Sequence, residues 1–149
     1  MDQTHRQILT LLLCLRTLPG VGFTQTRDGF LGHHWGTPVA TLAQSVELHT
    51  PRAEGDVILY NTAVTEVDHV AVQQCDLEFV SGRLAGVIVT VRGEENSRGF
   101  LSLLLREYGE GESDHPRARR WTTPNTRVSF DLDTHGDAYI YWYSTLLQN

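Results

Sequence analysis

The segment 70–91 constrains the fold most, because it has the pattern of two β-strands joined by a tight turn. Ser81-Gly82 lies between two stretches of apolar and polar residues, and such a dipeptide is typical of a hairpin turn. On the first strand, three residues of one parity are predicted to face a core: Cys75, Leu77 and Phe79. The return strand is apolar on both parities around Ile88, so we predict that it is central and covered on both sides.

Other segments supply more strands and two helices. Thr37-Pro38 predicts a short helix from Pro38 to Gln44, with the Thr37 hydroxyl as its cap. A longer helix is predicted to begin at Asn96 or Ser97 and to end at Gly109, whereas the stretch 110–125 has the composition of a loop. Further strands are predicted at 46–50, 57–62, 128–132 and 138–143, with a turn-rich stretch at 51–56. The order predicts an α+β fold: an antiparallel sheet of about five to six strands, with one long and one short helix packed on one face.

Length and charge limit the function classes. The chain has 149 residues, which fits a single domain, and its net charge of −6 comes from 12 basic and 18 acidic residues. It contains no lysine. Nucleic-acid binding depends on clustered positive charge, so this composition argues against a nucleic acid as partner.

The first residues have the layout of a secretory signal peptide. Arg6 lies in a polar head, an apolar run follows from Ile8 to Leu15, and Pro19 and Gly20 come next. The apolar run is too short to span a bilayer, which needs about 20 residues, so no transmembrane segment is predicted. We therefore expect a signal peptide at 1–26, a single α+β domain at 27–149, and a periplasmic or secreted location. Cleavage at that point leaves Cys75 as the only cysteine.

A motif follows the expected cleavage region. It reads F-x-G-x-x-W-G-T-P from Phe30 to Pro38, and a second pattern, F-x-x-G-R-L-x-x-V, runs from Phe79 to Val87. With the helix that ends at Gly109 and the aromatic hairpin at the C-terminal end, these patterns resemble a group of small exported bacterial proteins of unknown function. The resemblance implies export and a compact α+β fold, and it implies no activity.

No pattern in the sequence is typical of an enzyme. There is no G-x-S-x-G turn, phosphate loop, dinucleotide motif or His/Cys zinc spacing. Cys75 falls in the middle of a predicted strand, where a cysteine is usually structural. We therefore predict a non-catalytic protein without a cofactor.

One metal-binding alternative stays open. The turn from Asp131 to Asp137 begins like a calcium loop, but its fifth position is His135 and its twelfth is Trp142, where oxygen ligands are needed. A polar hairpin turn therefore explains the segment better. The alternative function is a metal-binding protein or metal-dependent enzyme that uses His33, His34 and this turn.

Two groups of residues are candidates for a binding surface. Tyr139, Tyr141 and Tyr143 share one face of a predicted strand, and they face outward if the residues between them pack under the helices. The reverse arrangement, with partly buried tyrosines, also fits the sequence. The second group comes from an arginine-rich stretch near Trp121, and its candidate contact residues are Arg119, Arg120 and Trp121, with Arg117 and Arg127 nearby.

These features together predict a binding or assembly module of the cell envelope. The expected partner is an envelope protein, a glycan or a second copy of the chain.

Overall fold

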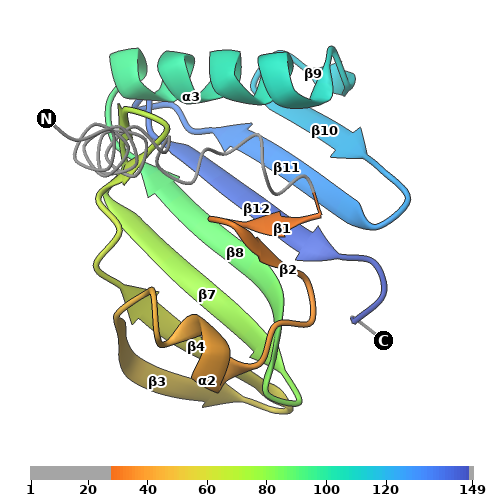
Figure 1. Cartoon of the computed structure of the whole chain (residues 1–149). Coiled ribbons are helices and arrows are strands. Elements are labelled where there is room, and N and C mark those ends of the chain that lie inside the picture. The colour runs from red at the N-terminus through yellow and green to blue at the C-terminus, as the bar shows by residue number, and fades with distance from the viewer. Residues whose placement is uncertain (1–27, 148–149) are drawn as a thin grey trace, which may run out of the picture.

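The computed structural model describes residues 28–147, and its largest part is one antiparallel sheet of 8 strands (Figure 1). The strand order is β3-β4-β7-β8-β12-β11-β10-β9. The strands are β3 (Leu48–Glu54), β4 (Val57–Thr62), β7 (Gln74–Val80), β8 (Arg83–Val91), β9 (Glu112–His115), β10 (Ala118–Thr122), β11 (Thr126–Leu132) and β12 (Ala138–Ser144). After β8 the chain crosses to the far edge and returns strand by strand, so that β12 pairs with β8 in the middle of the sheet.

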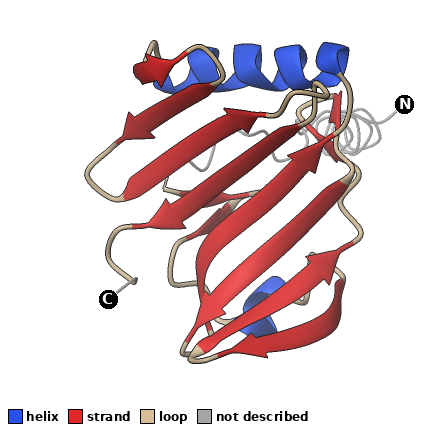
Figure 2. Cartoon of the chain, turned by 180° about the vertical axis from the view of Figure 1, so that it is seen from behind, coloured by secondary structure: helices blue, strands red, loops and turns tan. Residues whose placement is uncertain are grey.

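The smaller elements lie on one side of this sheet. They are the helices α2 (Val39–Leu42) and α3 (Glu94–Tyr108), and the two-stranded pairs β1 (Gly29–Phe30) with β2 (His33–His34) and β5 (Glu66–Val67) with β6 (Val70–Ala71). Seen from behind, the strands of the main sheet lie in front of both helices, and no other described element covers them (Figure 2). We call the covered side the core face and the uncovered side the open face.

The core is centred on Trp142 of β12, which is fully buried. Its ring centroid lies 5.6 Å from that of Phe30 and 5.7 Å from that of Phe100 on α3. The indole therefore joins the β1–β2 pair, the sheet and the long helix in one cluster. The three core residues predicted on β7 are confirmed as buried: Cys75, Leu77 and Phe79.

The predicted turn of the central hairpin and the predicted end of the long helix are confirmed. Ser81 and Gly82 both have positive φ, 51° and 73°, as a two-residue hairpin turn of the favoured kind requires. Gly109 ends α3 with a φ of 84°. The helix begins earlier than predicted, at Glu94, with Gly93 as its N-cap residue and the favourable acidic side chains of Glu94 and Glu95 in its first turn. The Ser97 hydroxyl, predicted as a possible cap, donates instead to the carbonyl of Gly136.

The predicted strand number was too low, since the sheet has 8 strands rather than about five to six. The stretch 110–125, predicted as a loop, contains the edge hairpin β9–β10. Its side chains are mostly polar because β9 is an exposed edge strand, and only Trp121 is buried. The predicted turn at 51–56 is also mostly strand, because proline is tolerated in an edge strand such as β3.

The return strand β8 is central, as predicted, but it is covered on only one face. On the open face Ile88 lies between Asp76 of β7 and Tyr141 of β12, and its side chain is partly exposed. The neighbouring side chains, rather than a second layer, shield this part of the strand.

The F-x-G-x-x-W-G-T-P motif holds the segment before α2 against the central hairpin. The backbone N–H of Gly36 donates to the carbonyl of Leu84 at 2.8 Å, and the Arg83 guanidinium donates to the carbonyl of Gly36 at 3.2 Å. The Thr37 hydroxyl donates to the carbonyl of His34 and does not cap α2, whose N-cap residue is Pro38. The two sequence patterns of the resemblance therefore contact each other.

Candidate functional site

Six side chains on three neighbouring strands form an array on the open face. Directly paired residues of antiparallel strands point to the same face, so the register defines two rows across the sheet. One row is Arg120, Ser129 and Tyr141, and the other is Thr122, Arg127 and Tyr143. These residues line a groove of about 500 Å³, which we call the open-face groove.

The tyrosines of β12 face outward, as the first of the two sequence interpretations predicted. Ile140 and Trp142 are fully buried on the core face, so the alternating side chains of Tyr139, Tyr141 and Tyr143 lie on the open face. Tyr139 is 47% exposed. The ring centroids of Tyr141 and Tyr143 are 4.8 Å apart with an interplanar angle of 32°, so the two rings form one aromatic surface.

A buried carboxylate and a glycine set the position of Tyr141. Its hydroxyl donates to Oε2 of Glu78 at 2.9 Å, and the Glu78 side chain is itself buried. Gly86 lies between them on β8, where a Cβ atom would stand 3.1 Å from Cε2 of Tyr141 and 3.4 Å from Oε2 of Glu78. The absence of a side chain at 86 therefore makes room for the ring and the carboxylate.

The two arginines of the groove differ in their partners. Arg120 donates to Oδ1 of Asp131 at 3.0 Å and to the carbonyl of Phe130 at 3.2 Å. Arg127 is exposed, and its side chain forms no hydrogen bond or ion pair within residues 28–147. The charge that remains unpaired in the groove is therefore that of Arg127, a residue that the sequence placed near the arginine-rich stretch but not among the contact residues.

Arg119 and Trp121 do not join the other predicted contact residues. Both lie on the opposite face from Arg120, because successive residues of β10 alternate between the two faces. The guanidinium of Arg119 donates to the carbonyl of Glu110 at 2.6 Å. Trp121 is 3% exposed, and its indole N–H donates to the carbonyl of Gly109 at 2.8 Å. These two residues attach the edge hairpin to the end of α3.

The turn between β11 and β12 is the polar hairpin turn that the sequence favoured. Oδ1 of Asp133 accepts the backbone N–H groups of His135 and Asp137 at 2.8 and 3.0 Å. The hydrogen bond from Asp137 is the main cause of a lowered pKa at Asp133. Nowhere in the described part of the chain do three or more His, Cys, Asp or Glu side chains gather as a metal site, so the metal alternative has no assembled ligand set there.

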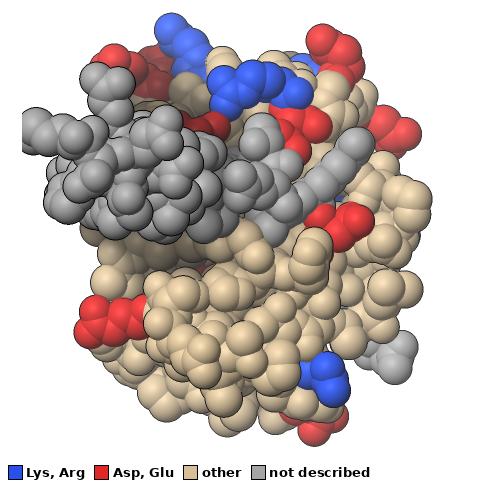
Figure 3. Space-filling view, viewed as in Figure 1, with Lys and Arg blue, Asp and Glu red and all other residues tan. Residues whose placement is uncertain are grey.

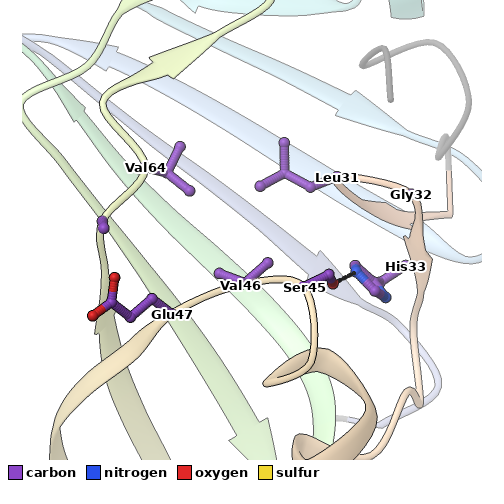
Figure 4. A pocket seen from close by; sticks show the side chains of 8 residues that line it. Leu31, Gly32, His33, Ser45, Val46, Glu47 and Val64 are labelled. Carbon is purple, nitrogen blue, oxygen red and sulfur yellow. Dashed lines mark hydrogen bonds between the residues drawn. The ribbon is translucent and has the colours of Figure 1, made fainter. Parts of the chain in front are cut away.

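A second cavity, of about 540 Å³, lies on the helix-bearing side of the molecule (Figure 4). Leu31, Val46 and Val64 line it, and at one side Nε2 of His33 is 2.7 Å from the hydroxyl oxygen of Ser45. A serine nucleophile needs a base that a third group orients, and within residues 28–147 the second ring nitrogen of His33 has no such partner. The contact instead connects β2 to the segment after α2.

Charged side chains are unevenly distributed on that same side. In the space-filling view they gather at the top, along α3, whereas the lower part of the described surface is mostly uncharged (Figure 3).

The unpaired guanidinium of Arg127 lies on the other side of the sheet, in the open-face groove. We therefore take the open-face groove as the candidate functional site.

Cys75 is a structural residue rather than a nucleophile. Burial raises the pKa of its thiol from 9.0 to about 12; the charge of Asp76 adds to the rise, and a hydrogen bond to Thr62 partly offsets it. The folded chain keeps this thiol protonated at neutral pH, where nucleophilic cysteines need a thiolate.

We expect iodoacetamide at pH 8 to alkylate Cys75 about a thousandfold more slowly in the folded chain than in the chain unfolded by urea. The same pKa shift makes the stability of the fold depend on pH. Its contribution to the free energy of unfolding is fully present below pH 9. It is lost as the pH rises from 9 towards 12, because only the thiol of the unfolded chain ionises in this range. Timed alkylation with mass spectrometry of the Cys75 peptide measures the rate. Equal rates in the two states would show that the thiol is accessible and reactive in the fold.

Comparisons with protein-family models, with curated proteins and with solved structures find no match to this chain. No helix within residues 28–147 combines the length and the apolar character needed to cross a membrane.

Proposed function

We propose that this protein is an exported, non-catalytic binding module of the bacterial cell envelope, which holds its partner in the open-face groove. The observation that carries the proposal is the aromatic surface of Tyr141 and Tyr143 beside the unpaired guanidinium of Arg127. The main cluster of buried apolar residues lies on the other side of the sheet, so the packing of that cluster does not require aromatic side chains here. Tyrosine and arginine are the residue types most enriched among the residues that dominate binding energy.

The envelope location rests on the sequence. The predicted signal peptide lies outside the described residues, and it supports export through its polar head, short apolar run and small-residue region. The resemblance to small exported bacterial proteins supports the same location. An envelope protein, a glycan or a second copy of the chain is the proposed partner, and the alternative of a metal-binding protein lacks an assembled site among residues 28–147.

The test has two steps in an expressing bacterium. Intact mass of the protein in the periplasmic fraction is expected to show a chain shortened by about 20–26 residues at its N-terminus. The purified mature protein is then sedimented with isolated cell envelopes. Replacing Arg127 and Tyr143 together by alanine is expected to lower the retained fraction about tenfold, because it removes the free cation and half of the aromatic surface.

A matched variant controls for charge. Arg98→Ala removes one arginine from the exposed face of α3, where Arg98 pairs with Glu94, and it should sediment like the wild type. A full-length product in the cytosol would contradict export. Retention that is unchanged in the Arg127 and Tyr143 double variant would contradict the open-face groove as the binding site.

A further inference from the structure

We infer that the open-face groove binds a polysaccharide that carries carboxylate groups, such as a chain of uronic acid residues. This inference rests on the proposed function and names the chemistry of its ligand. It follows from three features of the groove: its aromatic strip, its single unpaired cation and its hydroxyl groups.

The aromatic strip fits a row of sugar rings. Tyr141 and Tyr143 line the groove, and Tyr139 continues the row beyond it. The three tyrosines extend over about 13 Å, since each residue of a strand adds about 3.3 Å. The faces of aromatic rings carry partial negative charge, so they attract the C–H groups on the apolar face of a pyranose ring. The rings of Tyr141 and Tyr143, 4.8 Å apart and tilted by 32°, offer such a surface in the groove.

The unpaired cation selects an acidic ligand. Arg127 is the direct cross-strand partner of Tyr143, so a guanidinium lies beside the aromatic strip. A guanidinium binds a carboxylate through two parallel hydrogen bonds, which a neutral sugar does not offer. A sugar stacked on Tyr143 therefore places its carboxylate next to Arg127.

The other charges of the face are already compensated or lie farther away. Asp131 accepts the guanidinium of Arg120. The buried carboxylate of Glu78 accepts the hydroxyl of Tyr141 and lies on β7, three strands away from Arg127 on β11. Glu112 is the partner of Arg120 on β9, on the side away from Arg127. The net charge close to Arg127 is therefore positive, although the chain as a whole carries a net charge of −6.

The aromatic side chains argue against a phosphate polymer such as poly(glycerol phosphate). Such a chain binds mainly through its charges and has no ring to stack on Tyr141 and Tyr143, and this groove offers one unpaired guanidinium within residues 28–147 of an acidic protein. A uronic acid chain has a pyranose ring beside the carboxylate in every unit. The hydroxyls of Ser129 and Thr122 also line the groove and can exchange hydrogen bonds with sugar hydroxyls.

The experiment is isothermal titration calorimetry of the mature protein with an oligogalacturonate, with the same oligomer after reduction of its carboxylates to alcohols, and with poly(glycerol phosphate). We expect binding of the oligogalacturonate, and affinity at least about tenfold lower for the reduced oligomer and for the phosphate polymer. Equal affinity for the reduced oligomer would overturn the role of the carboxylate. Tighter binding of poly(glycerol phosphate) would overturn the choice of a glycan.

Two glutamine variants separate a specific contact from general charge. Arg127→Gln is expected to lose about tenfold in affinity for the oligogalacturonate. Arg98→Gln makes the same change in net charge on the exposed face of α3, far from the groove in the fold, and it should bind within about twofold of the wild type. An equal loss in both variants would show that overall charge alone governs binding.

The aromatic contribution is tested independently. Tyr143→Ala should weaken binding of both the acidic and the reduced oligomer, because stacking does not depend on the carboxylate. If no oligosaccharide binds while envelope retention still depends on Arg127 and Tyr143, the glycan inference falls and the proposed function stands, with an envelope protein or a second copy as the partner. If retention is also independent of these residues, both proposals fall.

Discussion

Trp142→Ala is expected to lower the free energy of unfolding by about 3–5 kcal/mol, the usual range for removing a large buried aromatic side chain. Trp142 is fully buried and packs between Phe30 and Phe100, so its loss leaves a cavity where three elements meet. Domains of this size are stable by about 5–15 kcal/mol, so the expected loss is a substantial share of the total. Urea unfolding followed by circular dichroism measures the change.

The control is Tyr139→Ala on the same strand. Tyr139 points to the open face and is 47% exposed, so its removal should cost less than about 1 kcal/mol. If both variants lose the same free energy, Trp142 is not the centre of the core. If the Trp142→Ala variant does not fold, Trp142→Phe takes its place. It should lose less unfolding free energy than Trp142→Ala, but still more than Tyr139→Ala.

Gly111→Ala is expected to cost about 2–4 kcal/mol and to detach the edge hairpin β9–β10. Gly111 has a φ of 66°, a left-handed conformation that costs an L-residue about 1–2 kcal/mol. A Cβ atom there would also lie 2.5 Å from the carbonyl oxygen of Arg120 and 2.6 Å from Nε1 of Trp121. These atoms belong to a strand backbone and a buried indole, so relief requires the hairpin to move.

Gly55→Ala is a matched control for this substitution. Gly55 has the same φ of 66°, but no atom lies within 4 Å of the Cβ position. The Gly55→Ala variant should therefore lose only about 1–2 kcal/mol of unfolding free energy, from the left-handed conformation alone. Urea unfolding gives the difference between the two variants, and Trp121 fluorescence reports the hairpin. Equal losses would mean that the contacts of Gly111 do not hold the hairpin in place.

The parts of the fold that the sequence predicted share a strong local signal. The Ser81-Gly82 turn, the core parity of Cys75, Leu77 and Phe79, and the end of α3 at Gly109 all depend on turn residues and periodicity. The edge hairpin β9–β10 has neither signal, since most of its side chains apart from Trp121 are exposed or half-exposed and its strands are held by backbone pairing. Local patterns cannot reveal a strand whose side chains do not alternate between apolar and polar, even when its partner strands are adjacent in the chain.

The sequence also predicted part of the candidate site, and again only the part that has a local pattern. The outward tyrosines follow from strand alternation, which the sequence shows directly. Arg119 and Arg120 were grouped because they are adjacent in the sequence, but in a strand adjacent residues point to opposite faces. The contrast between a paired Arg120 and an unpaired Arg127 depends on Asp131, which only the register of β10 and β11 brings close.

The position of β12 also affects when the fold can form. This strand follows the other seven strands of the sheet in the chain, yet it lies at the centre, between β8 and β11. Until β12 pairs with them, β8 and β11 each have an unpaired edge. The core also lacks the indole of Trp142. The two halves of the sheet therefore join only through contacts between distant segments, and such closure is slow. Such a delay would favour the export that we propose, since a polypeptide that is still open can be threaded through a narrow translocation channel.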